Sequence, residues 1–237
     1  MQSVLVIAAV APAVWLLVKV YRADRLEREP VGLIASLALL GIVSTTLAAL
    51  AEQLGELALS RFYPEGALPY DVILYFGIVA FSEEGFKYLL LKKRTWRSPE
   101  FNCLFDAVVY AVSVSLGFAL WENIGYVLRY GMGAAFARAL TAVPGHACFG
   151  VFMGAWYGAA KRRELAGDPL RAERCRRMAV LVPALLHGCY DFIAARQSES
   201  MSTVFVVFVA LMFFIAYRLI VRISKNDGYL NPRWDLF

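Results

Sequence analysis

Seven long apolar segments, separated by short polar stretches, constrain this chain more than any other feature. Most approach or exceed the roughly 20 residues with which a helix crosses the hydrocarbon core of a bilayer. A helix also satisfies every backbone polar group within one segment, as the bilayer interior requires. We therefore expect an all-α, polytopic bundle of about seven transmembrane helices. The segments cover residues 3–20, 31–58, 70–91, 101–128, 137–160, 178–195 and 203–221.

The composition agrees with this interpretation. Of the 237 residues, 60% are hydrophobic and 18% are charged, whereas soluble domains carry about 25% charged residues. The spans leave no room for a separate soluble domain, so we expect one integral membrane domain over residues 1–237. The net charge of +5 does not indicate nucleic-acid binding, because the basic residues lie in short loops between spans. The four cysteines show no spacing typical of a disulfide framework or a zinc motif.

The basic residues are distributed unequally between the two sides of the predicted bundle. Nineteen lie on one side and four on the other, and the positive-inside rule places the larger group in the cytoplasm. The amino terminus is then outside the cell membrane and the carboxyl terminus cytoplasmic. We expect the first segment to be retained as a helix, because its basic residues follow the apolar stretch instead of preceding it. The nineteen are Lys19, Arg22, Arg25, Arg28, Lys92, Lys93, Arg94, Arg97, Lys161, Arg162, Arg163, Arg171, Arg174, Arg176, Arg177, Arg218, Arg222, Lys225 and Arg233; the four are Arg61, Arg129, Arg138 and Arg196.

Several ionisable side chains lie inside the predicted spans, where such groups are energetically expensive and usually functional. With a helical rise of about 1.5 Å per residue, five of them lie roughly 13–22 Å from the nearest cytoplasmic basic residue. They fall in one slab around the middle of the membrane, as a common polar cavity requires. These five are Glu83, His187, Glu122, Asp191 and His146.

Helical spacing predicts how the acids of the third span divide their roles. Glu83 and Glu84 lie four and three residues before Lys87, so either acid can pair with the lysine. Adjacent residues point about 100° apart on a helix. We therefore expect Glu83 to face the cavity and Glu84 to form a structural ion pair with Lys87. Asp106 we expect to be structural, as a second partner of Lys87.

These residues carry a resemblance to the PrsW family of intramembrane proteases. The stretch 83-EEGFK-87 resembles the EExxK motif of that family, and 187-HGCYD-191 resembles its closing HxxxD motif. Phe118 and Glu122 resemble the FxxxE of its second block, and the stretch around His146 resembles its third. The resemblance covers about residues 70–195 and implies that spans three to six form a four-helix catalytic core. The wider clan contains the CAAX prenyl proteases, which typically have arginine in the first motif and histidine in the second, so Lys87 and Glu122 favour the PrsW branch.

Hydrolysis of a peptide bond inside a membrane needs a held water, a base and donors for the oxyanion. Our hypothesis is that Glu83 and Glu122 share a site and activate water without a metal or another cofactor. His146, His187 and Asp191 then orient the water and stabilise the oxyanion. The resemblance implies a single-span membrane protein as substrate, such as an anti-sigma factor. The expected function is therefore a metal-independent intramembrane endopeptidase embedded in the lipid bilayer.

Three other interpretations remain open at this point. Two histidines and several carboxylates could bind zinc, which would make the protein an intramembrane metalloprotease. Intramembrane acids also serve proton-coupled transporters, and a non-catalytic scaffold could contain buried ion pairs and packed histidines. The glycines at 150, 154 and 158 we interpret as a packing surface, since small residues four apart let helices approach closely.

The predicted orientation can be tested directly with topology reporters. A reporter fused after Phe237 should be cytoplasmic, and one inserted in the 196–202 loop should be outside, because nineteen of the basic residues lie on one side. An external carboxyl-terminal reporter would contradict the orientation and the depths derived from it.

Overall fold

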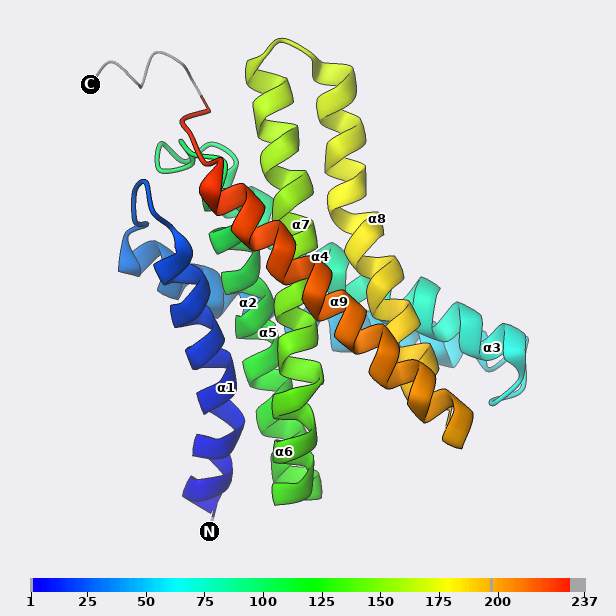
Figure 1. The fold of residues 1–237 in the computed structure, drawn as a ribbon. Coiled ribbons are helices and arrows are strands. Elements are labelled where there is room, and N and C mark those ends of the chain that lie inside the picture. Colours follow the sequence, from blue (N-terminus) through cyan, green and yellow to red (C-terminus); the bar gives the residue numbers. More distant parts are fainter. Residues whose placement is uncertain (1, 197, 231–237) are drawn as a thin grey trace.

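The computed structural model describes residues 2–196 and 198–230, and in this part of the chain helices joined by short connections make up nearly the whole fold (Figure 1). Residues 1, 197 and 231–237, and with them the predicted cytoplasmic Arg233, lie outside the described residues. The helices are α1 (Gln2–Ala23), α2 (Val31–Leu59), α3 (Leu68–Val72), the π-helix η1 (Ile73–Val79), α4 (Ala80–Thr95), α5 (Asp106–Tyr130), α6 (Met132–Leu140), α7 (Ala142–Leu165), α8 (Pro169–Ala194) and α9 (Glu199–Lys225).

The predicted helical membrane bundle of about seven spans is confirmed. Within the described residues, six helical stretches are long and apolar enough to cross a membrane: α1, α2, α5, α6 with α7, α8 and α9. The third predicted span corresponds to α3, η1 and α4 in succession, from Leu68 to Thr95. This stretch is interrupted by the π-helix and contains the charged residues of the EExxK motif.

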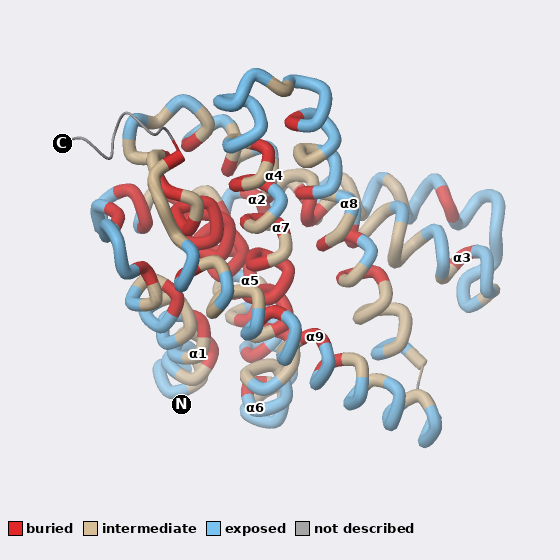
Figure 2. Tube along the Cα trace, turned by 45° about the horizontal axis from the view of Figure 1, so that its top comes forward, coloured by how far each residue is buried: buried red, intermediate tan, exposed pale blue. Residues whose placement is uncertain are grey.

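Helix α5 lies at the centre of the bundle, and the outermost helices present apolar side chains outward. Every residue of α5 from Asp106 to Ala119 is buried, while α1 and α9 present many exposed positions (Figure 2). The exposed positions of α1, α2 and α9 include Ile7, Leu54 and Val206, with 67%, 69% and 65% of their surface accessible. Since apolar surface is unfavourable in water, these faces are the ones that lipid covers.

The glycines of α7 let this helix pack directly on the backbone of α5. A Cβ atom added at Gly154 would lie 2.6 Å from the carbonyl oxygen of Ala107 and from Cα of Val108. Gly150 packs in the same way against α5, and Gly158 packs against the start of α5 and against Leu104 just before it. The predicted packing role of this glycine series is confirmed, and the close approach holds His146, one turn before Gly150, beside α5.

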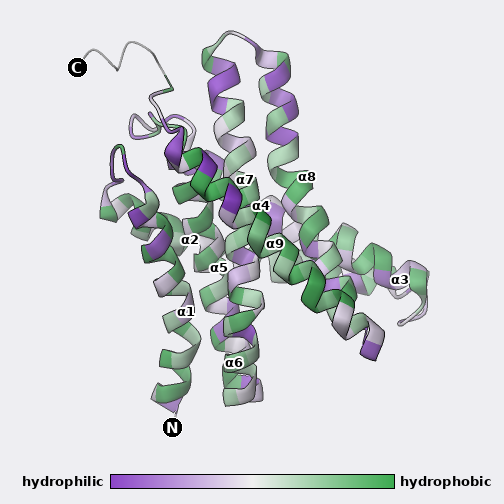
Figure 3. Cartoon of the chain, viewed as in Figure 1, coloured by the Kyte–Doolittle hydropathy of each residue, from purple (hydrophilic) through white to green (hydrophobic). Residues whose placement is uncertain are grey.

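Polar residues gather at one end of the molecule, where Figure 3 shows the tip of the α7–α8 hairpin and the end of α9 as the most hydrophilic parts. The sequence predicts a loop over 161–177, and this is wrong. Helix α7 continues to Leu165 and α8 begins at Pro169, so only a tight turn remains. Gly167 provides the positive φ of 76°, and the side chain of Asp168 caps α8 by accepting the backbone N–H of Arg171.

Two segment boundaries also differ from the predicted ones, because hydropathy does not mark where helices begin. The fourth segment starts at residue 101 in the sequence, whereas α5 starts at Asp106 and the preceding residues form a loop. The fifth segment starts at residue 137 in the sequence, whereas the structure has two helices there, α6 and α7, which are separated at Thr141. The backbone there has φ −123° and ψ −70°, which is not helical.

The packing of α7 on α5 can be measured with two matched substitutions. Gly154→Ala should destabilise the protein by about 1–3 kcal/mol, because the new methyl group overlaps the α5 backbone. Gly125→Ala, at an exposed helical position with nothing within 4 Å, should be neutral or stabilise by up to about 1 kcal/mol, because alanine favours helix. Thermal unfolding of both variants in detergent checks this. Equal effects of the two substitutions would contradict the close approach.

Candidate active site

The third span reaches the site through an unusual helical turn. Residues Ile73–Val79 form a π-helix directly before α4, which carries Glu83, Glu84 and Lys87. Widened π-turns inside α-helices occur frequently at functional sites. Tyr75 and Val79 of this turn line an internal cavity. The irregular turn thus forms one wall of the space into which α4 projects Glu83.

A fully buried lysine joins the acidic residues to a histidine. Nζ of Lys87 lies 2.8 Å from Oε1 of Glu84 and 3.1 Å from Oε2 of Glu83. Its third neighbour is Nδ1 of His146 at 3.3 Å, and the ammonium lies 3.8 Å from the centroid of the Phe118 ring. An ammonium group only donates hydrogen bonds. Nδ1 of His146 therefore accepts, which leaves the ring hydrogen on Nε2.

The other face of His146 continues the chain of hydrogen bonds. Its Nε2 lies 3.0 Å from Oε2 of Glu122 on α5 and donates to it. The same oxygen accepts a hydrogen bond from Nη2 of Arg138 on α6, at 2.7 Å. Glu122 is thus held between a histidine and an arginine, which stabilises its ionised form.

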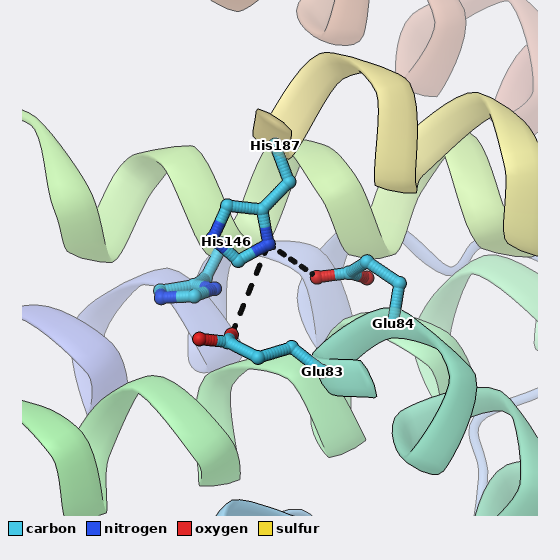
Figure 4. Close-up of side chains that lie close together, drawn as sticks. All are labelled: Glu83, Glu84, His146 and His187. Atoms are coloured by element: carbon cyan, nitrogen blue, oxygen red, sulfur yellow. Dashed lines mark hydrogen bonds and ion pairs between the residues drawn. The ribbon is translucent and has the colours of Figure 1, made fainter. Parts of the chain in front are cut away.

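His187 of α8 connects the acids of α4 with Asp191. Its Nδ1 lies 3.1 Å from Oε1 of Glu84 and 3.8 Å from Oε2 of Glu83, and both contacts are drawn in Figure 4. Its Nε2 lies 3.3 Å from Oδ2 of Asp191, one turn further along the helix. Both ring nitrogens therefore face carboxylate oxygens and are placed to donate.

The contacts form one continuous polar chain through α4, α5, α6, α7 and α8. It runs from Arg138 at one end to Asp191 at the other, and the two histidines stand edge to face with ring centroids 5.3 Å apart. The chain lines a cavity of about 300 Å³. Since a water occupies roughly 30 Å³ of liquid volume, the cavity has room for several waters.

The two adjacent glutamates stand differently toward this cavity. Glu83 lines it, with 8% of its side chain accessible, whereas Glu84 is fully buried and outside the lining. Lys87 contacts both acids and not Glu84 alone. At the far side, the side chains of Glu122 and Asp191 are 22% and 24% accessible. Glu122 and Asp191 are therefore more accessible than Glu83.

Carboxyl groups outnumber permanent cations around the cavity. Among the described residues, Lys87 and Arg138 are the permanently charged cations that bond to the site acids. A site of low polarity does not hold unbalanced anions. The balance must come from protons held by acids and histidines or from a bound cation. The carboxyl groups are Glu52, Glu83, Glu84, Glu122 and Asp191.

Four of these side chains also meet the requirements of a metal site. One ligand atom from each of Glu83, Glu84, His146 and His187 lies within 4.8 Å of the others, and all four are buried. Imidazole nitrogens and carboxylate oxygens are typical zinc ligands, so the donor chemistry fits. The ammonium of Lys87 bonds to three of the four donors and competes for their lone pairs.

Comparison with known proteins assigns the family. A family model described as "PrsW family intramembrane metalloprotease" matches residues 29–217. Protease PrsW of Oceanobacillus iheyensis is 34% identical over 221 residues, which cover 92% of this chain and 95% of that protein. Protease PrsW of Bacillus subtilis is 33% identical over 192 residues, covering 81% and 83%. The chain belongs to the PrsW family. No solved structure matches it significantly.

The residues that carry the PrsW resemblance are brought together by the fold. The structure places Glu83, Glu122, His146, His187 and Asp191 around one cavity. Glu84 and Lys87 lie directly behind them. The prediction that Asp106 is a second partner of Lys87 is wrong. Its Oδ2 accepts the backbone N–H groups of Asn102 and Cys103 instead, because Asp106 begins α5 and binds the loop that precedes this helix.

Two residues of the PrsW site were not anticipated from the sequence. From the sequence, Arg138 is only one of the four basic residues on the predicted outer side. In the structure Arg138 lies on α6, and its guanidinium reaches Glu122. Glu52 of α2 also lines the cavity, and its Oε1 has no hydrogen-bond partner among the described residues. Glu52 could have been found, because it is an acid within a predicted span. Nothing in the sequence indicates the turn that brings Arg138 inward.

The buried lysine should be essential for stability. Lys87→Ala should destabilise the protein by about 3–5 kcal/mol, because it leaves Glu83 and Glu84 buried without their cation. The matched control is Arg177→Ala, whose partner Glu173 is exposed, and little change is expected there. Thermal unfolding in detergent distinguishes the two. A Lys87→Ala protein as stable as the control would show that the ion pair is not needed to hold the site.

Proposed function

We propose that this chain is an intramembrane endopeptidase in which Glu83 and Glu122 activate water without a metal. Membership of the PrsW family supports a protease over a transporter or a scaffold. The single observation that carries the proposal is the cavity of about 300 Å³ inside the bundle, into which both acids and both histidines project. Water, a base and hydrogen-bond donors are thereby available inside the membrane.

Glu83 is the acid best placed to act as the general base. It lines the cavity, whereas Glu84 is fully buried and bonds to Lys87 and His187. Glu122 lines the same cavity but is held by Arg138 and His146. Glu122 is therefore suited to hold the water as an acceptor, while Glu83 takes its proton.

In the proposed reaction, the water oxygen attacks the carbonyl carbon of the substrate and its proton passes to the carboxylate of Glu83. The carbonyl electron pair moves onto the oxygen. When the C–N bond breaks, Glu83 returns the proton to the leaving nitrogen, which yields a carboxylic acid and an amine. A carboxyl group in a site of low polarity serves both steps, since burial brings its acid and base forms closer in energy.

The donors for the oxyanion come from the same polar chain. His146, His187 and Arg138 line the cavity wall. Their N–H groups bond to carboxylates in this structure, so the proposal has one of these donors exchange its carboxylate for the oxyanion when substrate enters. Asp191 contacts Nε2 of His187 at 3.3 Å. Its role in the proposal is to orient that imidazole. Residues 70–195, which contain the four motif-bearing spans, would then form the catalytic core.

The proposed substrate is a single-span membrane protein, such as an anti-sigma factor. We expect it to be cut near the extracytoplasmic boundary of its membrane span. Glu122 and Asp191 are more accessible than Glu83 and lie toward the side that the basic-residue distribution predicts to be external. A helix exposes a peptide bond only after its backbone hydrogen bonds are released, and in lipid this is easiest near a helix end. Mass spectrometry of the product should place the cut there, and a Glu83-dependent cut at the cytoplasmic boundary would contradict this.

The role of Glu83 can be tested by an isosteric substitution. Glu83→Gln should lower the cleavage rate in liposomes by about 100-fold or more, because the general base is lost, while the protein remains folded. Glu65→Gln, at an exposed acid of the α2–α3 connection, is the matched control and should cleave normally. Full activity of Glu83→Gln would refute its assignment as the base.

A zinc metalloprotease is the second candidate function, because four donors lie within 4.8 Å of one another and the family description contains the word metalloprotease. Glu83, Glu84, His146 and His187 would hold the ion. A bound zinc ion polarises a carbonyl and lowers the pKa of a coordinated water.

The two candidates differ in their dependence on metal. For the metal-independent enzyme, purified protein should keep its activity after dialysis against a chelator, with zinc far below one per chain by elemental analysis. For the metalloprotease, zinc should be present at about one per chain. Chelation should then abolish cleavage, and added zinc should restore it.

A further inference from the structure

A second group of buried acids lies away from the PrsW motifs, where the α1–α2 connection meets the start of α5. Asp24 follows α1, Glu29 precedes α2 and Asp106 is the first residue of α5. One carboxylate oxygen from each lies within 4.8 Å of the others. Asp227, two residues after the end of α9, contributes a fourth charge that acts on Asp24. Three separate parts of the chain thus bring acids to one place.

These acids are buried without partners for several of their oxygens. The accessible fractions of Asp24, Glu29 and Asp106 are 3%, 4% and 0%. Within the described part of the chain, no well-aligned hydrogen bond reaches either carboxylate oxygen of Asp24, Oε2 of Glu29 or Oδ1 of Asp106, and the same holds for Oδ2 of Asp227. Among residues 2–196 and 198–230, no basic side chain forms a salt bridge with these four acids. Buried, unpaired carboxylates are costly, so the group needs a positive partner.

In two of the four acids the other carboxylate oxygen is held in place by backbone donors. Oδ2 of Asp106 accepts the N–H groups of Asn102 and Cys103 at 3.0 and 2.6 Å. Oδ1 of Asp227 accepts the N–H of Phe105 at 2.9 Å. In Asp106 and Asp227 one oxygen is thus fixed by the protein and the other is left for an additional ligand.

We propose that Asp24, Glu29 and Asp106 bind one hard divalent cation, Ca²⁺ or Mg²⁺, at this end of the bundle. The site offers carboxylate oxygens, which are the ligands that these ions prefer. Calcium–oxygen distances of about 2.3–2.6 Å allow two ligands of one ion to lie at most roughly 5 Å apart, and the three oxygens lie within 4.8 Å of one another. Asp227 and water complete the coordination.

The buried carboxylates require neutralisation by a cation or by protons shared among them. Added Ca²⁺ or Mg²⁺ raises the Tm only if the ion binds to the folded protein, and this distinguishes the two means of neutralisation.

A bound cation would join parts of the chain that already contact one another here. The hydroxyl of Tyr21 donates to the carbonyl of Glu29 at 3.0 Å, and Ser224 donates to the carbonyl of Ala23 at 2.6 Å. Leu104 donates its N–H to the carbonyl of Gly228. The cation would therefore clamp the ends of α1 and α9 to the beginnings of α2 and α5.

The test is a titration of the full-length, chelator-treated protein in detergent with CaCl₂ or MgCl₂ at constant ionic strength. Above Kd, the Tm should rise by roughly 3–5 °C for each tenfold increase of the preferred ion. Equilibrium dialysis should find one ion per chain at this site. The Asp24→Asn/Glu29→Gln variant should lose the response, while Glu65→Gln, at an exposed acid, should keep it.

A second variant keeps the test decisive if the double variant does not fold. Asp24→Asn removes one ligand and should weaken the apparent affinity by on the order of tenfold or more. The proposal is overturned if neither ion raises the Tm of the unmodified protein. It is also overturned if the rise persists unchanged in both ligand variants, because the ion would then bind elsewhere. An increase of Tm on substitution without any ion response would indicate shared protons instead.

Discussion

The arrangement of this membrane protein depends on one ammonium group placed where water is absent. Lys87 is fully buried, and its three donors are all taken by Glu83, Glu84 and His146. Each acid would be prohibitively costly in that place alone. The lysine makes the pair of adjacent glutamates possible, and the ring of Phe118 covers its remaining face. The three charges lie on α4 and neutralise one another within that helix. The contacts of Lys87 with His146 and of Glu84 with His187 then join α7 and α8 to it.

Close packing at small residues lets side chains from several helices reach this polar group. Gly154 brings α7 onto the backbone of α5, which places His146 between Lys87 and Glu122. The π-turn before α4 opens the wall of the cavity, with Val79 and Tyr75 in its lining. The same central helix, α5, contributes Glu122 to the cavity and Asp106 to the acidic group at the opposite end. One rigid, buried helix thus supports both the catalytic proposal and the cation proposal.

Sequence reasoning succeeds here where the chemistry is local to one helix. Residues three or four apart share a face, so the contacts of Lys87 with its acids and of His187 with Asp191 follow from spacing alone. Hydropathy locates the spans because lipid-facing and buried positions are both apolar. It does not show that the polar 161–177 stretch is largely helical, because helices that leave the bilayer need no apolar residues. The position of Arg138 and the neighbours of Asp106 depend on how α6 and the α1–α2 connection fold back, which no local pattern encodes.

The central claim is that the motif residues surround a water-filled cavity reached from the outer side of the membrane. Two positions near Glu83 test it directly: Val79, which lines the cavity, and Phe81, which is 51% accessible and does not line it. Each is replaced by cysteine in a chain without its four natural cysteines, and a hydrophilic, membrane-impermeant thiol reagent is added from outside. The account predicts that Val79→Cys is labelled and Phe81→Cys is not. An unreactive Val79→Cys, or one labelled only from the cytoplasmic side, would contradict it.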